Sequence, residues 1–164
     1  MAIRSRRATL GVVGAVAGMG ALCCGFKAPA LVLFAAGLSL IEHDWRTRHP
    51  MFQGRVGERW QSALDFYRRT HLHPTNRTLH VIGIPLIAFG AIGLFVASPS
   101  AVSPVWLTSL GGFAVGWALN IVGHAGYEKR APAFSEDALS FLAGPVWDLQ
   151  QLFTRKSSAA PRES

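Results

Sequence analysis

The fold is set by residues 79–124, which read LHVIGIPLIAFGAIGLFVASPSAVSPVWLTSLGGFAVGWALNIVGH. Two apolar runs within them, Leu79–Ala97 and Val105–His124, contain no Asp, Glu, Lys or Arg. Ser98–Pro104 lies between the runs and is rich in serine and proline, which favour a turn. A helix needs about 20 mostly apolar residues to cross a bilayer, so each run is long enough to span one. Residues 79–124 therefore predict a transmembrane helical hairpin.

A second pair of apolar runs, Ala8–Phe26 and Ala28–Ile41, precedes this hairpin, with Lys27 and Pro29 at the bend. The 164 residues are 50% apolar and 15% charged, with a mean hydropathy of +0.28. Soluble domains carry about 25% charged residues. We therefore expect an all-α integral membrane protein with four transmembrane helices in two hairpins. The predicted layout is a first hairpin at 8–41, a second at 79–124, one membrane domain over 1–154 and a disordered tail over 155–164.

The basic residues are distributed unevenly around these helices. Lys27 is the only charged residue in the two turns predicted to face outward, and the other basic residues lie at 4–7, at 46–77 and after His124. The positive-inside rule then places both termini and the middle loop in the cytoplasm. We expect a bacterial inner membrane, with the endoplasmic reticulum membrane as the alternative. A signal peptide cleaved after Ala30 is the alternative to the first hairpin. We therefore interpret the net charge of +7 as a signal for the orientation of the helices in the membrane. No nucleic-acid-binding motif accompanies the basic residues.

Two further segments predict amphipathic helices at the membrane surface. Ser135, followed by Glu136 and Asp137, predicts a helix start, because a hydroxyl cap and early acids suit a helix N-terminus. Gly144–Pro145 predicts a break in that helix. Within residues 55–69, apolar side chains recur at helical spacing: Val56, Trp60, Leu64 and Tyr67.

All six histidines lie on the predicted cytoplasmic side. His80 begins one helix of the second hairpin and His124 ends the other, so antiparallel packing predicts that their rings meet. His71 precedes them in the adjoining loop, and Glu128 lies one helical turn after His124. Imidazoles with a carboxylate and no thiolate suit iron, zinc or manganese, and two histidines with one carboxylate are typical of non-haem Fe(II) oxygenases. We therefore predict a metal site, with Asn76 near enough to orient an imidazole.

Other chemistries have little support in the sequence. Cys23 and Cys24 are adjacent within an apolar run, which excludes a disulfide scaffold and a cysteine-based zinc site. The chain contains no G-x-S-x-G, P-loop or dinucleotide-binding motif. Two alternatives to an iron oxygenase stay open. One is another metal-dependent lipid enzyme, such as a hydrolase that uses a metal-activated water. The other is a non-catalytic membrane protein whose histidines hold the hairpin ends together.

Two segments resemble the signatures of the DUF962, or Mpo1-like, family of membrane proteins. Residues 71–80, HLHPTNRTLH, are similar to that family's H-x-N-P-x-N-x-x-x-H. Residues 121–133, IVGHAGYEKRAPA, are similar to its G-H-x-x-x-E-K-x-R-P-A. The resemblance lies within residues 55–153 and leaves the first hairpin outside. Two departures stand out: His73 replaces the usual Asn, and Ala131 takes the place of an Arg that often precedes the proline.

The resemblance implies an Fe(II)-dependent dioxygenase that shortens 2-hydroxy fatty acids by one carbon, consuming O2 and releasing CO2. The acyl chain of the substrate would then lie among the membrane helices. The implied site residues are His71, His80 and His124 as iron ligands, His43 and His73 as further candidate ligands, Asn76 and Glu128 as catalytic groups, and Lys129 and Arg130 as partners of the substrate carboxylate.

Overall fold

The computed structural model describes residues 5–99 and 103–158, and the described chain forms helices and loops without a strand. The predicted all-α class is therefore confirmed. Arg4, part of the turn at 98–104 and residues 159–164 of the predicted tail lie outside the described residues. The elements are α1 (Arg6–Cys23), α2 (Lys27–Arg48), α3 (Val56–Thr70), α4 (Pro74–Val96), α5 (Pro104–Val122), the π-helix η1 (Gly123–Glu128), the 3-10 helix η2 (Ala133–Ser135) and α6 (Ser140–Ser158).

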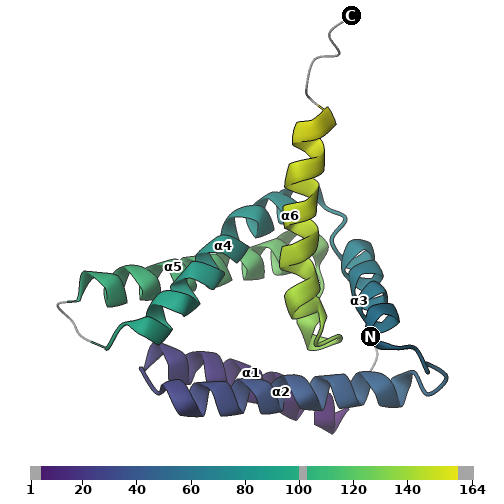
Figure 1. Ribbon diagram of the computed structural model, residues 1–164, viewed down its shortest axis with the longest axis horizontal. Coiled ribbons are helices and arrows are strands. Elements are labelled where there is room, and N and C mark those ends of the chain that lie inside the picture. Colours follow the sequence, from purple (N-terminus) through teal and green to yellow (C-terminus); the bar gives the residue numbers. More distant parts are fainter. Residues whose placement is uncertain (1–4, 100–102, 159–164) are drawn as a thin grey trace, which may run out of the picture.

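Helices α1 and α2 form a first antiparallel pair that packs through small residues (Figure 1). A Cβ atom added at Gly37 of α2 would lie 2.5 Å from the backbone oxygen of Gly11 on α1. Glycine at this position therefore lets the two backbones approach more closely than any larger residue would.

Helices α4 and α5 form a second antiparallel pair. Helix α4 and the continuous helix formed by α5 and η1, Pro104–Glu128, are each long and apolar enough to cross a membrane. In the most apolar window of each, only 22% of the residues are buried, so most of this apolar surface faces outward. Phe89 and Val96, for example, are 75% and 73% exposed. Water is a poor solvent for such a surface and lipid a good one. Among the described helices only this pair meets the length and composition criteria, so the predicted four spans are not confirmed.

The two pairs meet at their turns, where Gly25 lies against Pro99, and separate toward their other ends. Figure 1 shows the first pair along the bottom, the second pair at the left, and α3 and α6 in the space between their open ends. Because Gly25 adopts a φ of +83°, it also provides the left-handed backbone conformation that the first turn requires.

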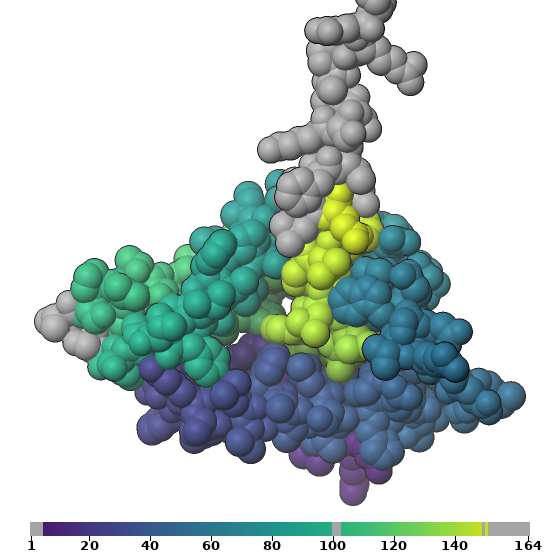
Figure 2. Space-filling model, viewed as in Figure 1, coloured from purple at the N-terminus to yellow at the C-terminus, as the bar shows by residue number. Residues whose placement is uncertain are grey.

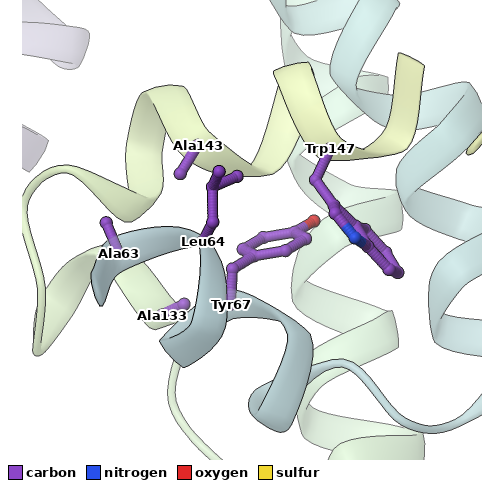
Figure 3. Packing of buried hydrophobic residues seen from close by; sticks show 6 residues of the cluster. All are labelled: Ala63, Leu64, Tyr67, Ala133, Ala143 and Trp147. Carbon is purple, nitrogen blue, oxygen red and sulfur yellow. The ribbon is translucent and has the colours of Figure 1, made fainter. Parts of the chain in front are cut away.

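Helix α6 packs against α3 through a cluster that is shown in Figure 3. An added Cβ atom at Gly144 would lie 2.5 Å from the ring of Tyr67, so this glycine admits the ring rather than ending the helix. Helix α6 also continues through Pro145, and the predicted break is wrong. The burial of Ala143 and Trp147 on either side offsets the hydrogen bond that a proline removes. The cluster consists of Ala63, Leu64, Tyr67, Ala133, Ala143 and Trp147.

A buried arginine joins the first pair to the rest of the chain. Arg59 of α3 is 2% exposed, and its guanidinium donates hydrogen bonds to both carboxylate oxygens of Asp137, at 2.9 and 2.7 Å. It also bonds both carboxylate oxygens of Glu42 on α2, at 3.1 and 2.5 Å, and lies 3.7 Å above the Trp45 ring. Arg59 lies in the segment 55–69 predicted as an amphipathic surface helix, and that pattern gave no sign of its burial.

The boundaries of two elements also differ from the prediction. Helix α6 begins at Ser140 and not after Ser135, because the carboxylate of Asp137 is used by Arg59 and by the backbone N–H of Leu139. Helix α4 begins at Pro74, where His73 caps it by accepting a hydrogen bond from the backbone N–H of Thr75. At the C-terminal end, α6 reaches Ser158, so residues 155–158 are helical.

Candidate metal centre

Three buried histidines from separate elements meet at the open end of the second pair. His71 follows α3, His80 lies on α4 and His124 lies in η1, and their residues are 2%, 4% and 4% exposed. The Nε2 atoms of His80 and His124 are 3.2 Å apart, as the predicted antiparallel packing requires. The three ring centroids lie 4.8 to 4.9 Å from one another, and the rings are nearly perpendicular in each pair. The histidines therefore surround one point in space.

Backbone carbonyl groups fix the tautomer of two of these rings. Nδ1 of His71 lies 2.9 Å from the carbonyl oxygen of Tyr67, and Nδ1 of His80 lies 2.9 Å from that of Asn76. A carbonyl oxygen only accepts hydrogen bonds, so each Nδ1 carries the proton and each Nε2 carries a lone pair. Such outer hydrogen bonds are typical of metal-binding histidines.

Burial also keeps the imidazole of His71 neutral. Removal from water lowers the pKa of His71 from 6.5 to about 3, and the neighbouring His80 adds to the shift. A neutral ring at physiological pH is the form that binds a metal ion.

The residues present fit a metal ion. Nε2 of His71 is buried without a hydrogen-bond partner, which is costly unless a ligand or ion takes its lone pair. Two nitrogen atoms bound to one ion at about 2.1 Å lie about 3.0–3.4 Å apart in octahedral or tetrahedral geometry, and the 3.2 Å between His80 and His124 matches this spacing. One candidate ligand atom from each of the three histidines lies within 4.8 Å of the others.

Asn76 and Glu128 brace this cluster from outside. The side-chain amide of Asn76 donates to Oε1 of Glu128 at 3.2 Å, and the same oxygen accepts the backbone N–H of His73 at 2.8 Å. The carboxylate thus ties η1 to the first turn of α4. A Cβ atom on Gly123 would collide with the amide of Asn76, so glycine is needed immediately before His124.

An apolar cavity of about 410 Å3 extends from the histidines between the two helix pairs. All three histidines line one end of it, and α1, α2, α4, α5 and α6 supply the walls. Figure 2 shows the surface hollowed between α4 and α6. This volume lies in the usual range for a small-molecule site.

Comparison with known proteins identifies the family of the chain. A family model described as "2-hydroxy-palmitic acid dioxygenase Mpo1-like" matches residues 58–156. The chain belongs to the Mpo1-like family. No curated protein and no solved structure matches the chain.

Other residues that the Mpo1-like resemblance implied lie outside the three-histidine cluster. His43 is exposed beside Arg7, with 3.3 Å between its Nδ1 and the guanidinium. The ring of His73 faces that of Tyr127, with 5.0 Å between centroids. Lys129 and Arg130 are exposed just after η1 and do not line the cavity.

Several polar groups at the site were missed by the sequence reasoning. The ring of Tyr67 stacks on that of His71 with centroids 3.7 Å apart, and its hydroxyl donates to Asp148 at 3.0 Å. Trp117, Asn120 and Ser140 line the cavity of this Mpo1-like protein, and each has a buried polar atom without a partner. One signal was available: Asn120 is a polar residue inside an apolar run, one turn before His124.

Proposed function

We propose that the protein is an Fe(II)-dependent dioxygenase that removes one carbon from 2-hydroxy fatty acids. The observation that carries this proposal is the position of three convergent, buried histidines at the end of an apolar cavity. The description of the matching family supports the same substrate class.

The reaction balances with O2 as the only oxidant. A 2-hydroxy acid, R–CH(OH)–COOH, and one O2 give R–COOH, CO2 and H2O. The bond between carbons 1 and 2 breaks, and oxidation of these two carbons supplies the four electrons that reduce O2. The proposed reaction therefore needs no separate organic reductant.

His71, His80 and His124 would hold the iron through ring nitrogens. Bound Fe(II) would supply the electronic coupling between O2 and an organic acid that these side chains lack. Three protein ligands leave other coordination positions open, and a 2-hydroxy acid offers two oxygens suited to chelation. The backbone carbonyl groups of Tyr67 and Asn76 keep His71 and His80 oriented and correctly protonated.

The cavity would bind the substrate and keep water away from the reacting carbons. Its aliphatic and aromatic walls suit an acyl chain. The side-chain oxygen of Asn120 would accept a hydrogen bond from the 2-hydroxyl, and the hydroxyl of Ser140 would donate one to the carboxylate, so that both unpartnered atoms are satisfied. Asn76 and Glu128 would act by positioning the histidines. Lys129 and Arg130 remain candidates for attracting the acid at the surface.

The positive-inside rule supports a cytoplasmic site in a bacterial inner membrane. The histidines lie beside the loop and helix that carry Arg68, Arg69 and Arg77, whereas the opposite end of the second pair carries the turn at Pro99. An endoplasmic reticulum membrane would give the same cytoplasmic orientation.

The test is oxygen consumption by detergent-purified protein loaded anaerobically with Fe(II) and then given 2-hydroxypalmitate and O2. We expect one pentadecanoic acid per O2 consumed, with loss of turnover in His71→Ala and His124→Ala. His43→Ala changes a histidine outside the cluster and should keep wild-type turnover. Zinc retention with hydrolysis of an ester substrate, and no O2 uptake, would instead support the metal-dependent hydrolase.

A further inference from the structure

The first helix pair lies outside the residues that the family model matches, yet it forms one wall of the cavity. Its contributions come from the C-terminal half of α1 and the N-terminal half of α2, next to the turn between them. These residues are Gly18, Met19, Leu22, Ala30, Leu31 and Phe34.

The opposite wall is one continuous face of the second pair. On α4 the lining residues recur every three or four positions from His80 to Phe95, and on α5 they recur in the same way from Phe113 to His124. At 1.5 Å per residue, the 15 residues from His80 to Phe95 cover about 22 Å. The cavity is therefore long and has the histidines at one end only.

The far end of the cavity lies where the two pairs meet. Gly25 and Pro99 bring the turns together there. Leu22 of α1 and Phe113 of α5 belong to one buried cluster at this end, with Met19, Ala91 and Phe95 packed against it. The first pair thus closes the cavity at the end farthest from the candidate metal centre.

We propose that the first helix pair measures the acyl chain, so that Met19 on α1 and Ala91 on α4 set the longest 2-hydroxy acid that the site accepts. This inference rests on the proposed function. Carbon–carbon bonds of about 1.5 Å at near-tetrahedral angles advance about 1.25 Å each, so an extended chain of 16 carbons is about 19 Å long. Such a chain fits the distance from His80 to Phe95.

The small side chain of Ala91 leaves room for the last carbons of that chain. Ala91 is 11 residues beyond His80, a rise of about 16 Å, which a chain of about 14 carbons already covers. A phenylalanine at either Ala91 or Met19 would fill the space that longer chains need. Each methylene group kept out of an apolar site lowers affinity by about fourfold, so excluding the last two carbons should lower kcat/KM by more than tenfold.

The experiment compares kcat/KM for saturated 2-hydroxy acids of 10 to 18 carbons at a fixed ratio of acid to detergent. Ala91→Phe and Met19→Phe should each lose more than tenfold for the 16-carbon acid and little for the 12-carbon acid. The matched controls are Ile92→Phe on α4 and Val16→Phe on α1, which are 59% and 54% exposed in the wild type and do not line the cavity. Both controls should keep the wild-type chain-length profile.

A binding measurement separates this inference from the proposed function. A 16-carbon 2-hydroxy acid brominated along its chain should quench the fluorescence of Trp117. The contribution of Trp117 is obtained by subtracting the fluorescence of the Trp117→Phe variant. If the wild type is quenched, Ala91→Phe is not, and no acid is turned over, the result supports the chain-length limit set by Met19 and Ala91 and overturns the dioxygenase proposal. If wild type, Ala91→Phe and Met19→Phe all turn over the acids with the same chain-length profile, the chain-length proposal is overturned and the dioxygenase proposal stands. Absence of both quenching and turnover would overturn both.

Discussion

Replacing Arg59 with methionine should cost this protein a large part of its stability. The substitution keeps an apolar stem of similar length but leaves the carboxylate of Asp137, which is 1% exposed, without its cation. Removal of one partner from a buried ion pair typically costs about 3–5 kcal/mol. Two bonds to Asp137 and two to Glu42 place Arg59 in that class and not among surface pairs, which contribute about 0–1 kcal/mol.

Thermal unfolding in detergent measures this effect. For a domain of this size each kcal/mol shifts Tm by about 2–4 °C, so Arg59→Met should lower Tm by about 6–20 °C. Arg69→Met removes an exposed arginine from the same helix and should change Tm by little. The double variant Arg59→Met/Asp137→Asn should recover part of the loss, because it removes the stranded charge and keeps an oxygen for the backbone N–H of Leu139. A fall below 2 °C for Arg59→Met would instead place Arg59 with the surface ion pairs.

Three further outcomes follow from the site and its supports. Asn120→Leu and Ser140→Ala should each raise KM for 2-hydroxypalmitate by about 2- to 10-fold at unchanged iron content, and unchanged KM would remove both from substrate binding. Gly123→Ala should displace the amide of Asn76 and lower stability by about 1–3 kcal/mol, measured as a fall in Tm. Burial raises the pKa of Asp148 from 3.8 to about 6, so the unfolded chain loses this proton at a lower pH than the folded protein. The free energy of unfolding should therefore fall by about 3 kcal/mol as the pH rises from 3.8 to about 6. Asp148→Asn should remove this pH dependence from a Tm series, and an unchanged series would contradict the assignment.

The second helix pair and the meeting of its histidines were predictable because both depend on local signals. Uncharged apolar runs give the helices, the Ser-Pro segment gives the turn, and antiparallel packing brings His80 to His124. The start of α4 was placed five residues late, at Leu79, because its first turn is polar and the prediction followed hydropathy alone. Pro74 after His73 was an available signal, since proline suits the first helical position.

The polar pairs that hold the helices around the site could not be predicted, because each joins residues that are far apart in the sequence. Arg59 and Asp137 are separated by 78 residues, and Tyr67 and Asp148 by 81. In the sequence Arg59 looks like any surface arginine, and Asp137 looks like an early acid of a helix. Their burial follows from how α2, α3 and the start of α6 come together. The cavity likewise depends on the angle between two helix pairs, which no local pattern encodes.

Iron content shows whether the three buried histidines form a metal site. Detergent-purified protein would be loaded anaerobically with Fe(II), desalted and assayed for metal, beside His80→Ala and the exposed-histidine control His43→Ala. We expect close to one iron per chain in the wild type and in His43→Ala, and a loss of most iron in His80→Ala with an unchanged helical circular dichroism spectrum. A wild-type protein that retains no metal, or a folded His80→Ala variant that keeps its full iron content, would contradict this expectation.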